Sequence, residues 1–167
     1  MKAALLISSV MALAITVATA SAQDKASNKF LTEAIQGNFA EVAMGQLAEK
    51  NGQSQEVKSY GQMLVSEHGS ANQKAMDVAK SMGMNPPAGP SAKQKAEHDK
   101  MAKLNGAAFD KAFAQHMVKD HKKDIAAYQK AAKKQDAAGQ YAQATLPTLQ
   151  KHLQNAQSLQ KQGTAKR

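Results

Sequence analysis

The fold is decided by the stretch NGAAFDKAFAQHMVKDHKKDIAAYQKAAK, residues 105–133, in which apolar side chains recur every three or four positions. Asn105-Gly106 separates this stretch from the preceding segment, because such a pair breaks a helix. The apolar residues then fall on one helical face, and they are Phe109, Phe113, Met117, Ile125 and Tyr128. The pattern predicts a long amphipathic helix from about residue 107 to residue 133.

Two further helices are predicted before this one, separated by a glycine. Gly52 ends a helix over residues 28–50, and we expect this glycine to adopt the left-handed conformation that is common just past a helix end. Ser54 caps the second helix, which runs to Gly83. Both segments carry apolar residues with the 3.6-residue period of a helix.

A proline-rich loop and a short helix come next. Residues 85–90 contain three prolines and form the main loop. Ser91 and Gln94 have the spacing of a capping box, which predicts a short helix that ends near Leu104.

The last helical region is capped by Asp136. Pro147 lies within it and predicts a kink or a restart, with a helix over residues 147–162. Four amphipathic helices bury their apolar faces most simply in an antiparallel four-helix bundle. The predicted fold is therefore all-α, with an extra short helix between helices two and three.

The composition supports this class. The 167 residues include no Cys and no Trp, and only seven Val and Ile residues follow residue 22. So few β-branched residues argue against a β-sandwich or a barrel. The lack of Cys excludes a disulfide scaffold, a thiolate nucleophile and a cysteine-based metal site.

The first 22 residues have the pattern of a secretory signal peptide. Lys2 precedes an apolar run over residues 3–17, and small residues at 20–22 suit cleavage before Gln23. The run is short for the alternative, a transmembrane anchor. We therefore expect a signal peptide over residues 1–22, a bundle domain over 23–162 and a disordered tail over 163–167, in a protein of the periplasm or outer envelope.

The chain is basic, with a formal net charge of +9 that falls to +8 once Lys2 is removed. Export makes nucleic acid an unexpected partner, so anionic envelope polymers are the partner that the charge suggests. The alternative is that lysines on the helix exteriors only keep the bundle soluble.

Four ionisable residues interrupt the apolar faces: Glu41, His68, His121 and His152. With the turns at 51–53 and 134–135 placed at one end of the bundle, the helical rise puts the three histidines within roughly 5 Å of one level. The same reasoning puts Glu41 about one turn lower.

Imidazole and carboxylate together are the ligands of zinc, iron, manganese or copper sites, so these four residues are candidate ligands of a divalent transition metal. The alternative is a hydrogen-bonded polar layer without metal, which sets the register of the helices. Glu67 and Asp120, each directly before a histidine, can serve only as outer partners. We identify no catalytic motif, so the third alternative, an oxidase or peroxide-handling enzyme, lacks the residues that it would need.

Five segments resemble a bacterial exported family known as domain of unknown function 4142, often labelled a predicted outer membrane protein. They are FLTEAIQGNFAEVAMGQLA (30–48), VKSYGQMLVSEHGSAN (57–72), LNGAAFD (104–110), MVKDH (117–121) and LPTLQKHL (146–153). The resemblance covers about residues 29–160 and implies a ferritin-like antiparallel four-helix bundle in the periplasm or on the envelope. The family's function is not established.

The chain departs from the di-iron proteins that share the ferritin-like fold. Those proteins use Glu-x-x-His pairs, whereas the residues three before the candidate histidines are Val65, Val118 and Leu149. A di-iron centre is therefore not expected. A mononuclear histidine-rich site is the metal centre that remains.

Overall fold

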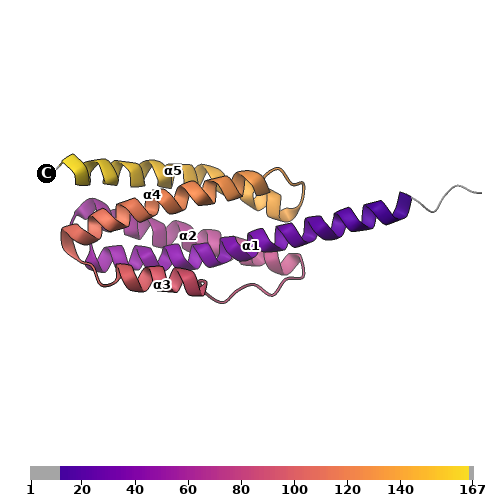
Figure 1. Ribbon diagram of the computed structural model, residues 1–167, viewed down its shortest axis with the longest axis horizontal. Helices are drawn as coiled ribbons and strands as arrows, with labels where there is room; N and C mark the ends of the chain where they lie inside the picture. Colours follow the sequence, from indigo (N-terminus) through magenta and orange to yellow (C-terminus); the bar gives the residue numbers. More distant parts are fainter. Residues whose placement is uncertain (1–11, 166–167) are drawn as a thin grey trace, which may run out of the picture.

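The computed structural model describes residues 12–165, with side-chain surroundings for residues 25–163 (Figure 1). This part of the chain is all-α, as predicted, and forms five helices and no strand. The helices are α1 (Ala12–Asn51), α2 (Gln55–Ser81), α3 (Ala92–Met101), α4 (Gly106–Ala131) and α5 (Ala137–Ala165).

The direction of α4 differs from the expectation that the turns at 51–53 and 134–135 share one end of the bundle. Gly52, in the α1–α2 turn, forms an isolated parallel bridge with Gly106 at the start of α4. Asp110, in the first turn of α4, accepts hydrogen bonds of 2.9 Å from two backbone N–H groups of the α1–α2 turn. The α1–α2 turn therefore lies against the beginning of α4, and the expectation was wrong.

The α4–α5 turn lies at the opposite end, where the Ser27 hydroxyl of α1 donates a hydrogen bond to Asp136. Helices α2 and α4 therefore start at the same end, because residues 82–105, including α3, cross back along the molecule (Figure 1). Helix α1 packs along α2 and α4, and α5 packs along α4 and α2. Each of these pairs is antiparallel, and α3 lies against α1 and α4.

The apolar core is divided into two clusters, both built from all four long helices. The cluster near the α4–α5 turn includes Phe30, Ile35, Tyr128 and Tyr141. The cluster near the α1–α2 turn includes Leu64, Phe109, Phe113 and Met117. Between the two clusters the buried side chains are polar, and this division places the candidate site at mid-height of the helices.

Three helix starts agree with the sequence analysis. Asp136 caps α5, because its Oδ1 accepts a hydrogen bond of 2.8 Å from the N–H of Gly139. Ser54 accepts a hydrogen bond of 3.3 Å from the N–H of Val57, and Ser91 with Gln94 forms the expected capping box. The last helix does not restart at Pro147, because α5 is one helix with Pro147 inside it. Pro147 is exposed, so its ring meets solvent, and because it has no N–H it cannot donate the helical hydrogen bond to the carbonyl of Gln143.

Both chain ends are more helical than expected. Helix α5 reaches Ala165, so residues 163–165 of the predicted disordered tail are helical, and residues 166–167 lie outside the described part. Helix α1 begins at Ala12 and passes through the predicted cleavage site without a break. Its first turns project beyond the other helices (Figure 1), and residues 1–11 of the predicted signal peptide lie outside the described residues.

Gly52 does not have the expected left-handed conformation, since only Gly83 and Gly106 have positive φ among the described residues. A glycine is needed at position 52 because a larger side chain would not fit there. A Cβ atom there would lie 2.5 Å from the carbonyl oxygen of Ala48 and 2.9 Å from a methyl group of Val57. Gly45 and Gly61, where α1 crosses α2, also leave no room for a Cβ atom.

We predict that Gly61→Ala destabilises the protein by about 1–3 kcal/mol, because overpacking a close contact forces the backbones apart. The added Cβ would lie 2.6 Å from the carbonyl oxygen of Gly45 and 2.9 Å from the Ala48 Cβ. Gly69→Ala, in the same helix with open space around it, is the control and should stabilise by about 0.5–1 kcal/mol. Urea unfolding measures both, and equal effects would contradict the close-packing role of Gly61.

Candidate metal site

The four residues selected from the sequence lie in one buried layer, one on each long helix. The exposed fractions are 2% for Glu41, 3% for His68, 1% for His121 and 0% for His152. Each residue occupies the inward face of its helix between the two apolar clusters. Polar groups this deeply buried need partners, since an unpaired one costs several kcal/mol.

The three imidazole rings face one another. Their centroids are 5.0 Å apart for His68 and His152, 5.4 Å for His121 and His152, and 5.7 Å for His68 and His121. One ring nitrogen from each histidine lies within 4.8 Å of the others. The prediction that the three histidines share a level is thus correct, even though α4 runs in the opposite direction. It holds because each histidine is near the middle of its helix.

Each ring also has an acceptor on its outer side. His68 Nδ1 is 3.0 Å from Asn38 Oδ1, His121 Nδ1 is 3.0 Å from the carbonyl oxygen of Met117, and His152 Nε2 is 2.9 Å from Glu67 Oε2. A carbonyl or carboxylate oxygen can only accept, so the ring nitrogen that faces it carries the proton. These contacts therefore select one tautomer for each ring.

The orientation of Asn38 is itself set by a neighbour. Its Nδ2 donates to the Tyr141 hydroxyl at 3.3 Å, and that hydroxyl donates to the carbonyl of Ala71 at 3.3 Å. Since the Tyr141 proton points to Ala71, Asn38 must turn its NH₂ toward Tyr141 and its oxygen toward His68. The tautomer of His68 thus depends on a hydrogen-bond chain that spans α1, α2 and α5.

These tautomers leave three unprotonated nitrogens: His68 Nε2, His121 Nε2 and His152 Nδ1. His68 Nε2 and His152 Nδ1 are 3.2 Å apart, a distance at which the two nitrogens hydrogen-bond if one of them carries a proton. With the tautomers above, their two lone pairs face each other. His121 Nε2 is buried, and no group in the described part of the chain hydrogen-bonds to it. In a tetrahedral zinc site, two nitrogen ligands about 2.05 Å from the ion are separated by about 3.4 Å.

The electrostatic surroundings keep the rings neutral. Burial lowers the pKa of His68, and the neighbouring His121 and His152 lower it further. Burial, with His152, lowers the pKa of His121 to about 4. Burial also lowers the pKa of His152, against the opposing effect of Glu67. Neutral imidazole is the form that binds metal.

Glu41 lies beside this group without joining it. Its Oε1 is 3.9 Å from His121 Nδ1, the nitrogen that donates to Met117, and the nitrogens that converge belong to the three histidines alone. Burial raises the pKa of Glu41 well above its usual value, and Asp120 and Asp124 raise it further. A bound cation would favour the charged form of this carboxylate.

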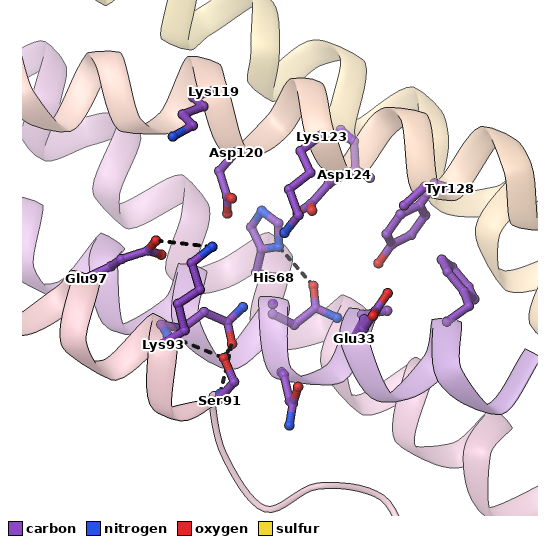
Figure 2. A pocket seen from close by; sticks show the side chains of 18 of the residues that line it. Glu33, His68, Ser91, Lys93, Glu97, Lys119, Asp120, Lys123, Asp124 and Tyr128 are labelled. Carbon is purple, nitrogen blue, oxygen red and sulfur yellow. Dashed lines mark hydrogen bonds and ion pairs between the residues drawn. The ribbon is translucent and has the colours of Figure 1, made fainter. Parts of the chain in front are cut away.

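A cavity of about 350 Å³ reaches the layer from the side on which α1, α3 and α4 meet (Figure 2). His68 and Asn38 line its inner part, while Lys93, Lys119 and Lys123 are exposed around it. His116 is half-buried in its wall. The cavity gives small ions and water a route to His68.

Sequence reasoning found the histidines and the outer role of Glu67 but missed Asn38. The signal was present, because Asn38 precedes Glu41 by three residues and is a polar residue on the inward stripe of α1. Gly37, directly before it, is only half-buried, at the cavity.

Comparison with known proteins identifies the family. A family model described as a domain of unknown function, DUF4142, matches residues 12–159. The chain belongs to the DUF4142 family. No curated protein and no solved structure shows significant similarity to this DUF4142 chain. Since the family description assigns no activity, the function has to be argued from the buried layer.

We predict that buried His121 makes stability depend on pH. Its pKa is about 4 when folded, against about 6.5 when unfolded, so between these values only the unfolded chain takes up the proton and stability falls as pH falls. From pH 7 to pH 5 the wild type should lose about 2 kcal/mol more than His121→Gln. Urea unfolding with a chelator present measures this. Parallel losses in the two proteins would show that His121 is not held neutral.

Proposed function

We propose that this DUF4142 chain is an exported metal-binding protein, in which His68, His121 and His152 hold one divalent transition metal ion. The observation that carries the proposal is the set of three buried imidazoles, each with an acceptor facing its outer ring nitrogen and with an inner ring nitrogen that lies within 4.8 Å of the other two. In metal sites, a histidine ligand characteristically donates its other N–H to a carboxylate or a carbonyl. Here Asn38, Met117 and Glu67 supply those acceptors.

Zn²⁺ and Cu²⁺ suit this donor set, because imidazole is a preferred ligand of both. Three protein ligands leave a coordination position for water or another ligand. The sequence suggested Glu41 as the fourth ligand, and its carboxylate would have to move from beside His121 Nδ1 to fill that role. Where Glu41 now lies, its negative charge would partly balance the charge of the ion.

The fold supports the proposal by analogy. One long crossover between the second and third long helices, here residues 82–105, is the connection found in ferritin-like bundles, which build metal sites in their cores. We therefore propose a ferritin-like four-helix bundle with α3 in the crossover. The missing Glu-x-x-His pairs argue for one ion held by histidines and against a di-iron centre.

Export and a place in the cell envelope complete the proposal, and they rest on the signal-peptide pattern of residues 1–22. Among the helices of residues 12–165, none is long and apolar enough to cross a membrane. In this setting we propose a role in metal handling or envelope stress. If no metal binds, the alternative is a structural protein whose basic exterior meets anionic envelope polymers.

We predict that Zn²⁺ at about 100 times its Kd stabilises the purified protein by about 2.7 kcal/mol, which raises the Tm by roughly 5–10 °C. His121→Gln should abolish the rise, because it removes one of three ligands. His98→Gln, on α3 and outside the buried layer, is the matched control and should keep it. Differential scanning calorimetry and metal analysis measure the shift and one ion per chain. An unchanged Tm at excess Zn²⁺ would overturn the metal proposal.

We also predict that Glu67→Ala weakens Zn²⁺ binding about 10–100-fold while the three ligands remain. The variant removes the acceptor of His152 Nε2–H, so the ring is free to rotate and to change tautomer. Glu49→Ala, at an exposed position of α1, is the control and should bind as the wild type does. Competition with a chromogenic chelator measures the affinity. Equal affinities would show that Glu67 does not position the ligand.

A further inference from the structure

Exposed charges are distributed unevenly over the bundle. In residues 106–163, which contain α4 and most of α5, every exposed charged side chain is a lysine. The acidic residues of this part are only partly exposed, since Asp110 and Asp136 accept backbone hydrogen bonds at helix starts and Asp120 and Asp124 line the cavity. The exposed surfaces of α1 and α2, by contrast, carry acidic and basic residues together.

Six of these lysines follow the outer side of α4, and we call them the α4 lysine face. The five that lie within the helix fall in an arc of about 120°, opposite the buried side chains of Phe113, Met117 and His121. Along the helix axis they extend over about 29 Å. The α4 lysine face consists of Lys111, Lys119, Lys122, Lys123, Lys130 and Lys133.

Neighbouring acidic groups do not neutralise this face. Within residues 25–163, the ion pairs of lysine join Lys29 with Glu33 and Lys93 with Glu97, and neither pair includes a lysine of the face. Helix α5, which packs along α4, contains no acidic residue. The positive charge of the α4 lysine face is therefore available to an external partner.

The lysines are also close enough to repel one another. Lys119 precedes Lys122 and Lys123 by three and four residues, and Lys130 precedes Lys133 by three. Like charges at these spacings destabilise a helix. A partner that carries several negative charges in a row would relieve this repulsion, so the face favours a polymer over a single small anion.

The other exposed side chains indicate which polymer fits. In residues 106–163 they belong only to Gln, Ala, Ser, Pro and Gly, and Gln115 and Gln129 lie on the outer side of α4 beside the lysines. An amide both donates and accepts hydrogen bonds, which suits sugar hydroxyl groups. Helices that lie on membranes insert Trp, Phe or Leu, and proteins that hold single-stranded nucleic acid stack bases on aromatic rings. Neither kind of residue is exposed in this part of the chain.

We propose that the α4 lysine face binds a linear anionic polysaccharide, whose negative groups lie along α4 and whose hydroxyl groups meet the glutamines. The inference rests on the proposed export, since such polymers would be met in the envelope. It does not depend on the metal ion, because the face lies on the side of α4 opposite His121. The partner is thus assigned to one face of one helix.

Heparin, a linear anionic polysaccharide, is the probe. Isothermal titration calorimetry measures its affinity for the purified protein with a chelator present, at low and at physiological salt. We expect binding that weakens as salt increases, because bound lysines displace the counterions of the polymer and salt screens their attraction.

A triple variant tests the location of the binding surface. Lys111→Gln, Lys122→Gln and Lys130→Gln together should weaken heparin binding about tenfold or more. The matched control removes the same net charge from α2, which packs along α1 and α5, and it combines Lys58→Gln, Lys74→Gln and Lys80→Gln. This control should bind heparin within about twofold of the wild type. Circular dichroism melting checks that both variants are folded.

Equal weakening by the two triple variants would overturn the proposal, because net charge alone would then explain the binding. Affinity that does not change with salt, or no binding even at low salt, would overturn it as well. Tighter binding to phosphatidylglycerol vesicles or to duplex DNA than to heparin would assign the face to a membrane or to nucleic acid instead. Zn²⁺ binding is measured on the same variants, so failure of the metal site and failure of this face give different results.

Discussion

The arrangement of three buried imidazoles, each donating its outer N–H to a neighbour, is the constraint on which the rest of the structure depends. It requires an acceptor behind each ring, and Asn38, Met117 and Glu67 provide them from three different helices. It also divides the apolar core into two clusters. The outer ring nitrogens of the three histidines thus have hydrogen-bond partners. The inner ring nitrogens point toward one another, around the position that a metal ion would occupy.

Burial affects the histidines and the carboxyl groups of this layer in opposite directions. Burial lowers the pKa values of the histidines, while burial and the neighbouring Asp120 raise the pKa values of the nearby carboxyl groups of Glu41 and Asp124. The pKa of Asp124 rises to about 7 for this reason. Lysines surround the cavity at its exposed edge. The interior thus offers imidazole nitrogens and carboxylate oxygens side by side, which are donors of different chemical hardness.

Much of the fold could be predicted, because it depends on local signals. Caps such as Ser54 and Ser91 and the 3.6-residue apolar period act over a few residues, so the helices followed from them. The direction of α4 could not be predicted, since it depends on contacts such as Asp110 with the distant α1–α2 turn. Pro147 misled because a proline on the exposed face of a long, well-packed helix removes one hydrogen bond without ending the helix.

The sequence by itself determined that the protein is helical, that it has no cysteine chemistry, and that His68, His121 and His152 interrupt buried stripes. Only the tertiary structure decided what those histidines are able to do. A tautomer depends on which acceptor lies behind the ring, and for His68 that acceptor is oriented by Tyr141, 103 residues from Asn38 along the chain. No local sequence pattern predicts a contact of this kind, because it forms only when the helices pack together.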